Sequence, residues 1–156
     1  MPRGRSSSTY RVQVEFRAPL EFVYRWCTDY TTRDAKYEAE SYQRRIFHRS
    51  PRKVVYEDLE STKHGWSWSH HVVRLLPPNR WHSDSVGSHR SIRLDYRLTR
   101  RPYGSTRLTL TAHRTPCGVG TKNPTRSDWE RSVRLTWKRF GRVLERDFRR
   151  ASRGLK

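Results

Sequence analysis

Hydrophobic and polar residues alternate along residues 10–16, YRVQVEF, with the hydrophobic residues at even positions. Such alternation is typical of a strand with one buried face. The segment APLEFVYRWCTDY comes next, with Pro19 suited to a first helical turn and with Phe22, Val23 and Trp26 on one helical face. We therefore expect a strand followed by a short helix.

From residue 42 to residue 115 the alternation returns, and closely spaced turn signals such as RSPRK, KHG, LPPNR, VGSH and RRPYG interrupt it. Six further antiparallel strands are expected near residues 42–49, 53–60, 66–76, 80–87, 89–100 and 104–114. Together with the first strand they predict a sheet of about seven strands.

The apolar residues of the later strands share one parity: Trp66, Trp68, His70, Val72, Leu76, Val86, Ile92, Leu94, Tyr96, Leu98, Leu108, Leu110 and Ala112 occupy even positions. Hairpins that pair Leu98 with Leu108, and Tyr96 with Leu110, would keep that parity on one face. The even face is therefore predicted to be apolar, and the odd face to be solvated. His71 does not fit this pattern, and neither do its odd-numbered neighbours in the same strand.

The C-terminal segment has the spacing of a long amphipathic helix, since apolar residues recur every three or four positions at Trp129, Val133, Trp137, Phe140, Leu144, Phe148 and Ala151. Ser127 and Glu130 have the spacing of a capping box. The even face of the sheet is the large apolar surface that this stripe could cover. We expect the helix to pack across it, which gives an α+β fold.

A chain of 156 residues with 33% hydrophobic residues fits one domain. We expect a disordered basic tail over residues 1–9 and a single domain over residues 10–153. Cys27 and Cys117 are too far apart in sequence for a CxxC site and suggest no disulfide framework, so a reduced, cytoplasmic setting is expected. No stretch approaches the length of a membrane span.

The formal net charge is +19, and 28 of the 34 basic residues are arginines. Such an excess should attract a polyanion, either nucleic acid or an anionic membrane surface, although it could also be a matter of composition alone. The candidate polyanion surface is formed by Arg93, Arg97 and Arg107 on the odd face of the sheet and by Arg134 and Arg142 on the C-terminal helix.

The segment WSWSHHVVRLLPPNRWH, residues 66–82, combines tryptophans, histidines and an arginine. If its even positions face the helix, its large rings either fill the core or contact a ligand. The predicted cavity residues are Trp66, Trp68, His70, Val72, Tyr96, Trp129, Val133 and Trp137.

Pairing Arg74 with His82 would bring Asp84 opposite Val72, so that Arg74, His82 and Asp84 would form a polar cluster on one face of this hairpin. Two interpretations remain open for it: a solvated mouth of the pocket, or an internal charge network that contacts a ligand. Metal binding is not expected, because His70 and His71 are neighbours in a strand and point to opposite faces, and no cysteine or carboxylate cluster completes a ligand set.

The order of strand, short helix, six strands and long helix resembles the START/Bet v 1-like superfamily, also called SRPBCC or polyketide cyclase/dehydrase-like. The segment APLEFVYRWCTDY, the LPPNRW turn and the hairpin YRLTRRPYGSTRLTL carry the resemblance, which spans nearly all of residues 10–153. Gly104 and Ser105 stand where that family usually has two glycines. The resemblance implies a helix-grip fold, in which the sheet curls around the long helix and leaves a cavity for a hydrophobic ligand.

Three functions follow from the resemblance and the charge. The first is a carrier or binding protein for a hydrophobic or amphipathic molecule such as a lipid, quinone or polyketide, without a cofactor. The second is an RNA-associated or ribosome-associated protein. The third is a cyclase or dehydratase, for which His70, His82 or Tyr96 could supply acid or base chemistry. No common catalytic motif is present, so the sequence favours binding over catalysis.

Overall fold

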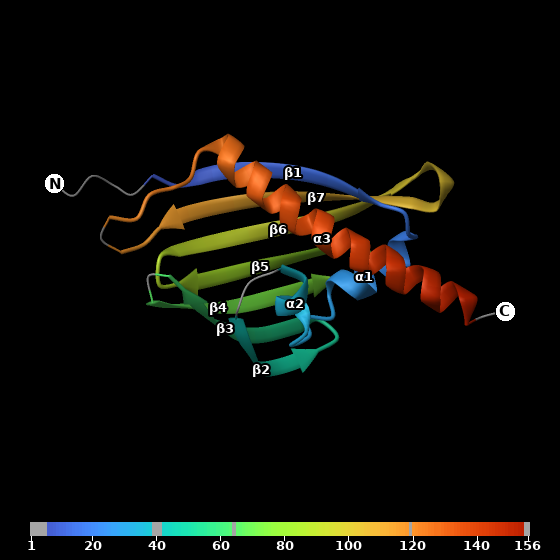
Figure 1. Ribbon diagram of the computed structural model, residues 1–156, viewed down its shortest axis with the longest axis horizontal. Helices are drawn as coiled ribbons and strands as arrows, with labels where there is room; N and C mark the ends of the chain where they lie inside the picture. Colours follow the sequence, from blue (N-terminus) through green and yellow to red (C-terminus); the bar gives the residue numbers. More distant parts are fainter. Residues whose placement is uncertain (1–5, 39–41, 64, 119, 155–156) are drawn as a thin grey trace.

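The computed structural model describes residues 6–38, 42–63, 65–118 and 120–154. Within them, seven strands form one antiparallel sheet in the order β1-β7-β6-β5-β4-β3-β2 (Figure 1). The strands are β1 (Ser8–Phe16), β2 (Tyr42–Ser50), β3 (Lys53–Thr62), β4 (Gly65–Leu76), β5 (Arg80–Gly87), β6 (Arg90–Arg101) and β7 (Ser105–Pro116). The sheet and its strand boundaries agree closely with the alternation in the sequence.

Among the described residues, three α-helices lie on one side of the sheet, where α3 (Arg126–Arg153) crosses it and α1 (Leu20–Cys27) and α2 (Asp34–Glu38) cover another part (Figure 1). The predicted helix-grip architecture is therefore confirmed. The five-residue helix α2 was not predicted, because it is too short for a periodic pattern and buries none of its side chains. Of the expected N-terminal tail, residues 1–5 lie outside the described residues, and β1 begins at Ser8.

The predicted hairpin registers are present in the sheet. Leu98 pairs with Leu108 and Tyr96 with Leu110 between β6 and β7. Arg74 pairs with His82 between β4 and β5. Short turns of the expected lengths thus fix which residues stand opposite each other.

The predicted inward parity of β4 and β5 is wrong. Val86 of β5 pairs with Ser91 of β6, so four residues lie between these partners, and Trp81 pairs with Tyr96. An even number of intervening residues places opposite parities on the same face, whereas a three-residue connection keeps the parity. Odd positions therefore point inward in β4 and β5, while even positions point inward in β6 and β7.

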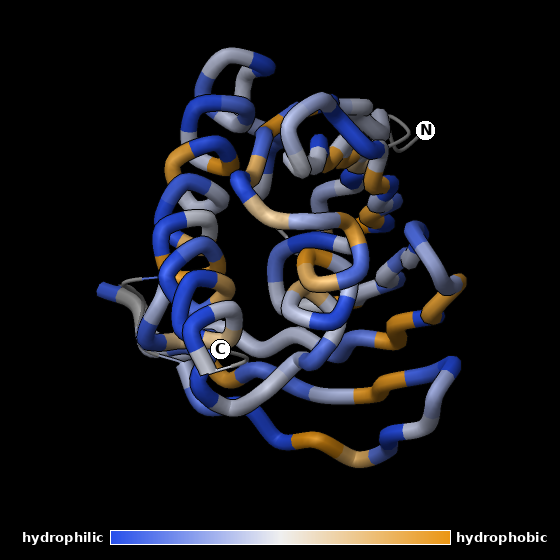
Figure 2. Tube along the Cα trace, turned by 90° about the vertical axis from the view of Figure 1, so that its right-hand side faces the viewer, coloured by the Kyte–Doolittle hydropathy of each residue, from blue (hydrophilic) through white to orange (hydrophobic). Residues whose placement is uncertain are grey.

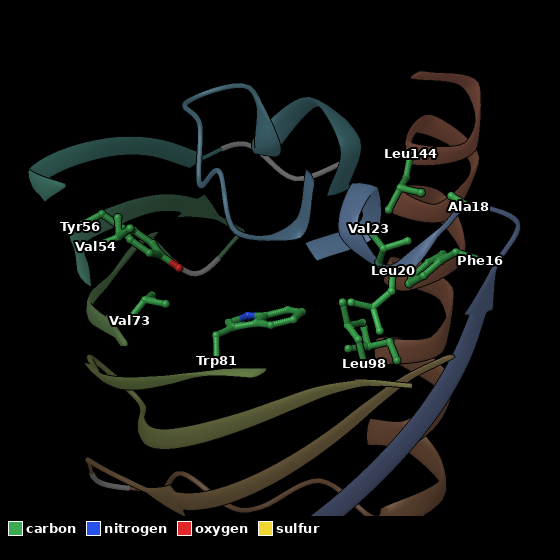
Figure 3. Close-up of a cluster of buried hydrophobic side chains, with 11 residues drawn as sticks. Phe16, Ala18, Leu20, Val23, Val54, Tyr56, Val73, Trp81, Leu98 and Leu144 are labelled. Atoms are coloured by element: carbon green, nitrogen blue, oxygen red, sulfur yellow. The ribbon is translucent and has the colours of Figure 1, made fainter. Parts of the chain in front are cut away.

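The main core lies between the sheet, α1 and α3 (Figure 3). Trp81 lies between two groups of side chains, one around Val54 and Val73 and the other around Leu98 and Phe16 (Figure 3). All five side chains are almost completely buried. The core thus spans strands from both halves of the sheet and anchors α3.

The helix α3 is mostly hydrophilic and carries its hydrophobic residues as short interruptions (Figure 2). Its N-cap is Thr125, whose Oγ1 accepts a hydrogen bond from the Asp128 backbone N–H at 3.2 Å. The cap therefore lies two residues before the predicted Ser127. Gly141 is buried against the Phe16 ring, and the missing side chain lets the helix approach β1 closely.

Candidate functional site

A cavity of about 240 Å³ lies on the inner side of the sheet, next to α2 and α3. Its wall is lined by Trp26, Cys27, Asp29, Tyr30, Asp34, Glu38, Tyr42, Arg44, Tyr56, Asp58, Glu60, Ser67, Ser69, His71, Trp81, Ser83, Arg90, Leu94, Tyr96, Trp137 and Phe140. Large rings and charged groups therefore line the same cavity, which is partly open to solvent.

The aromatic part of the wall is a continuous set of ring contacts. The Trp81 and Tyr96 rings stack with centroids 4.7 Å apart and planes inclined by 7°. Trp137 of α3 contacts Tyr96 edge-on at 6.1 Å and meets Phe140 at 5.4 Å. Because the stacked pair comes from β5 and β6 and the other rings from α3, the packing of the helix on the sheet shapes this wall.

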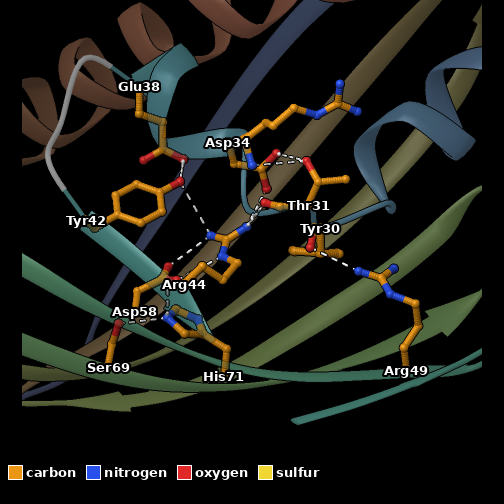
Figure 4. Close-up of polar contacts among 11 residues, drawn as sticks. Tyr30, Thr31, Asp34, Glu38, Tyr42, Arg44, Arg49, Asp58, Ser69 and His71 are labelled. Carbon is orange, nitrogen blue, oxygen red and sulfur yellow. Dashed lines mark hydrogen bonds and ion pairs between the residues drawn. The ribbon is translucent and has the colours of Figure 1, made fainter. Parts of the chain in front are cut away.

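The polar part of the wall is built around Arg44 of β2 (Figure 4). Its Nε and Nη2 donate to the two carboxylate oxygens of Asp58 at 2.8 and 2.9 Å, and its Nη1 donates to Asp34. The guanidinium carbon lies 4.2 Å from the centre of the Tyr56 ring. The Arg44 side chain is only 5% exposed, so this is a buried ion network with a cation–π contact.

The strand pattern explains why these charges point inward. Tyr42, Arg44 and Ile46 alternate along β2, and Arg44 stands opposite Asp58 of β3. This pair was not predicted from the sequence, although the signal was present. Arg44 and Asp58 carry opposite charges at inward positions of adjacent strands. Tyr42 and Ile46, on either side of Arg44, are large rings or apolar side chains on the same inward face.

Charges in the network shift one another's pKa values. Burial opposes the charge on Arg44, but its hydrogen bonds to Asp58 and the neighbouring negative groups outweigh this effect and raise its pKa. Burial raises the pKa of Asp34, which the Arg44 charge only partly counteracts. Asp34 and Asp58 therefore share one compensating cation in a poorly solvated place.

His71 of β4 lies next to Asp58 in the network, and its imidazole is neutral. Its Nε2 is 2.8 Å from the Ser69 Oγ, and its ring stacks on Tyr56 with centroids 4.4 Å apart. Burial lowers the pKa of His71 to about 3, and the Arg44 charge adds to the effect. The imidazole is therefore uncharged near neutral pH and offers hydrogen bonding but no positive charge.

One polar group of the cavity wall has no partner in the described part of the chain. The Ser83 Oγ is buried without a hydrogen bond, and the residue is only 3% exposed. An unpaired buried hydroxyl costs about 1 to 3 kcal/mol. Ser83 lines the cavity, so a ligand with a suitable donor or acceptor could satisfy it.

Other titratable groups line the cavity nearer α1. Burial, followed by the negative charge of Asp34, raises the pKa of Asp29 to about 6. Burial also raises the pKa values of the Cys27 thiol and of the Tyr30 and Tyr96 hydroxyls. These three groups are therefore protonated at neutral pH, and Cys27 is not an activated nucleophile.

The cavity contains some of the predicted residues but not others. Tyr96 and Trp137 line it, whereas Val133 does not, and Trp129 stacks instead on Tyr10 at 4.7 Å. Val72 points to the other side, with the rest of the even positions of β4.

The tryptophans at the start of the predicted cavity segment lie on the outer face of the sheet. Trp66 is 64% exposed and Trp68 is 41% exposed, and His70 lies beside them with its Nδ1 3.2 Å from Glu57. The reversed parity of β4 causes the error: Ser67 and Ser69 point inward and leave space for the cavity.

Neither interpretation of Arg74, His82 and Asp84 is correct for this cavity. These residues occupy even positions of β4 and β5, which belong to the outer face, and none lines the cavity. Of the three candidate acid or base residues, His70 and His82 are therefore outside. Only Tyr96 reaches the cavity.

The arginines of the predicted polyanion surface are exposed or partly exposed, but three of them have protein partners. Arg93 lies 3.5 Å from Asp95, Arg107 donates to Glu15 at 2.7 Å, and Arg134 donates to the Gln13 carbonyl oxygen at 2.8 Å. Arg97 and Arg142 make no ion pair with other described residues. Part of the basic surface is thus internally compensated.

Among the described residues, no group of three or more His, Cys, Asp or Glu side chains is arranged to hold a metal ion. Within the same residues, no helix combines the length and apolar character needed to cross a membrane.

No protein-family model and no curated protein matches the sequence. Solved structures do match the fold. The Zhui aromatase/cyclase from Streptomyces sp. R1128 has a TM-score of 0.71 at 13% identity, covering 93% of this chain and 95% of the other. A protein from Thermus thermophilus has a TM-score of 0.71 at 16% identity, covering 93% and 99%.

A START superfamily protein from Mycobacterium smegmatis has a TM-score of 0.65 at 13% identity, covering 92% of this chain and 98% of the other. At such identities the likeness concerns the fold, and it extends over nearly the whole length of each partner. The antiparallel sheet, the crossing helix and the cavity between them agree with it. The chain therefore shares the helix-grip fold of these structures.

Proposed function

We infer that the protein binds a small amphipathic molecule in the cavity between the sheet and α3. The observation that carries this proposal is the division of one cavity wall into an aromatic part, around Trp81, Tyr96 and Trp137, and a polar part, around Arg44 and His71. Apolar lining with a few fixed polar groups is the usual design of a small-molecule site.

The size and lining of the cavity narrow the ligand. A volume of about 240 Å³ lies just below the usual range for drug-sized ligands, so a compact molecule fits better than a long acyl chain. Stacked rings favour a flat aromatic body. The unpartnered Ser83 hydroxyl favours a ligand that also carries a hydrogen-bonding group.

The name of one similar structure supports the same ligand class. The matched Streptomyces protein is named an aromatase/cyclase, which points to ring-forming substrates. For this chain we favour binding over catalysis, because burial keeps the Cys27 thiol protonated and makes His71 a weak base, and Asp29, whose pKa is about 6, is the lining group that would supply acid–base chemistry. A cyclase or dehydratase remains the enzymatic form of the proposal.

A cavity-filling variant tests this function. Ser67→Phe would place a ring in the cavity, whereas Ser61→Phe would place the same ring on the outer face of β3. Melting temperatures should rise with bound ligand in the wild type and in Ser61→Phe, because binding stabilises the native state, but not in Ser67→Phe.

The ligands for this test are a panel of hydroxylated naphthalenes, quinones and short fatty acids, with native mass spectrometry as a second measurement of bound mass. Equal ligand-induced shifts of the melting temperature in both variants would mean that the ligand binds outside the cavity. The absence of a shift with every compound, together with no retained ligand in freshly purified protein, would reject the proposal.

RNA binding is the second candidate function, and a hollow lined by arginines favours it. Arg11, Arg80 and Arg97 line this hollow of about 270 Å³ on the outer face of the sheet, together with Thr109, Thr111 and Asp95, whose carboxylate lies 3.5 Å from the Arg93 Nε. Within the described chain none of the three arginines has an ion pair. Arginines without an ion pair can neutralise phosphates, which drives salt-dependent binding of nucleic acid.

A further inference from the structure

The ion network in the cavity contains more negative than positive charge. Arg44 is one cation placed between Asp34 and Asp58, whose side chains are 18% and 15% exposed. His71 cannot supply a second positive charge near neutral pH, because burial lowers its pKa to about 3. The network therefore keeps an excess of one negative charge when both carboxyls are ionised.

The rest of the wall increases this excess. Asp29, Glu38 and Glu60 also line the cavity, and Arg90 is the other arginine among its lining residues. Five carboxylates and two guanidinium groups leave an excess of three negative charges in the wall of a protein whose net charge is +19. Arg33 and Arg49 act on Asp29 from the α1–α2 segment and β2, and they offset part of its charge.

A second observation points to a ligand rather than to a solvated acidic patch. The Ser83 Oγ lies in the wall of the same cavity, is almost completely buried and has no hydrogen-bond partner in the described residues. Buried polar groups of this kind are normally satisfied by protein, water or a bound molecule. A hydroxyl can accept an N–H from a ligand.

The aromatic wall suits a cation as well as an apolar body. The Tyr56 ring already holds the Arg44 guanidinium at 4.2 Å, and Trp81 and Trp137 provide further ring faces and edges in the cavity. Cations are attracted to the faces of such rings, most strongly to tryptophan. The basic outer surface does not cancel this local preference, because salt screens exposed charges over about 8 to 10 Å.

We propose that the cavity selects a positively charged ligand, in which a protonated amine is attached to a compact aromatic body. This inference rests on the proposed function and adds the charge of the ligand to it. The amine would lie near the carboxylates of the Arg44 network, and the ring would lie against the stacked pair formed by Trp81 and Tyr96. An aromatic carboxylic acid of the same shape would be rejected by like charge.

Three probes of one shape test the proposal: 2-naphthylmethylamine, 2-naphthalenemethanol and 2-naphthoic acid. Their affinities are measured by titration calorimetry at pH 7.5 in physiological salt. The amine should bind about tenfold more tightly than the alcohol, and the acid most weakly. An amine that binds less than about threefold more tightly than the alcohol would overturn the charge preference but leave cavity binding intact, whereas failure of all three probes would count against both.

Matched variants locate the charge. Asp34→Asn should reduce the ratio of amine to alcohol affinity about tenfold, because Arg44 is then balanced by Asp58 alone. Asp84→Asn makes the same chemical change on the outer face and should leave the ratio unchanged. Equal losses in the two variants would overturn the proposal. Glu60→Gln, also in the cavity wall, replaces Asp34→Asn if that variant does not fold.

Discussion

Arg44 contacts both Asp34 and Asp58 in the cavity wall, and its removal would leave these two carboxylates without their cation in a poorly solvated space. Removing one partner from a buried ion network costs about 3 to 5 kcal/mol, because the remaining charges lose their compensation. We predict that Arg44→Met lowers the free energy of unfolding by this amount, as measured by urea denaturation.

Arg45 provides the control for this prediction. It follows Arg44 in β2 and is exposed on the opposite face. Arg45→Met should change the free energy of unfolding by less than about 1 kcal/mol. Similar losses in both variants would mean that β2 needs arginine for some reason other than the network.

His71 gives the protein a specific dependence on pH. Its pKa is about 3 in the folded protein and about 6.5 in an unfolded chain, so between these values only the unfolded chain binds the proton. Stability is therefore full above about pH 6.5 and falls as the pH drops. From pH 7 to pH 5 this contribution to the free energy of unfolding should decrease by about 2 kcal/mol.

Asp29 contributes with the opposite sign, because its raised pKa makes the folded protein bind a proton more readily than the unfolded chain between about pH 4 and pH 6. The measurement is therefore the difference between wild type and His71→Gln across the pH range. His113→Gln, on the exposed outer face, is the control and should follow the wild-type curve. Parallel curves for wild type and His71→Gln would contradict the prediction.

At the scale of elements, alternation and turn signals were enough to predict the strands, the long helix and the pairing of β6 with β7. They failed for β4 because its aromatic residues do not mark the core. Ser67 and Ser69 point inward, where the cavity needs space, and Trp66 and Trp68 point outward. Residue size therefore indicated the wrong face, whereas the even lengths of the β3–β4 and β5–β6 connections reveal the changes of parity.

The N-terminus of α3 allows a direct test of where the helix begins. The Thr125 side chain accepts from the Asp128 backbone N–H, whereas Ser127 lies inside the helix. Thr125→Ala should lower the free energy of unfolding by about 1 kcal/mol, because it leaves a helical N–H without its cap. Ser127→Ala should have a smaller effect, and a larger effect for Ser127 in denaturation experiments would favour the cap that the sequence pattern predicts.

At the scale of the whole molecule, acidic groups are concentrated in the cavity wall while arginines lie on the outer face of the sheet and along α3. The sequence predicted the basic exterior, because charge and strand parity are visible in it. The acidic interior could not be predicted, since it depends on β2, β3, α1 and α2 meeting at one place. Asp34 reaches Arg44 only because α2 packs near these strands.

RNA association can be tested at the same scale. Replacing Arg11, Arg80 and Arg97 with glutamine should flatten the plot of log affinity against log salt, by about 0.7 for each phosphate of single-stranded RNA that is no longer neutralised. Replacing Arg142, Arg149 and Arg150 of α3 removes the same charge elsewhere and should change the slope less. Equal slopes in both triple variants, measured by fluorescence anisotropy of labelled RNA, would place the RNA-binding surface elsewhere.

Because Trp66 and Trp68 lie on the outer face, the tryptophan fluorescence of the protein comes from two classes of ring, exposed and buried. Iodide is an anion, so the positive surface concentrates it around these exposed rings, whereas Trp81 is buried in the core. Iodide should therefore quench a red-shifted part of the emission and leave a blue-shifted remainder. The variant with Trp66→Phe and Trp68→Phe should lose most of the quenchable part, so that the remaining signal comes mainly from the tryptophans inside the molecule.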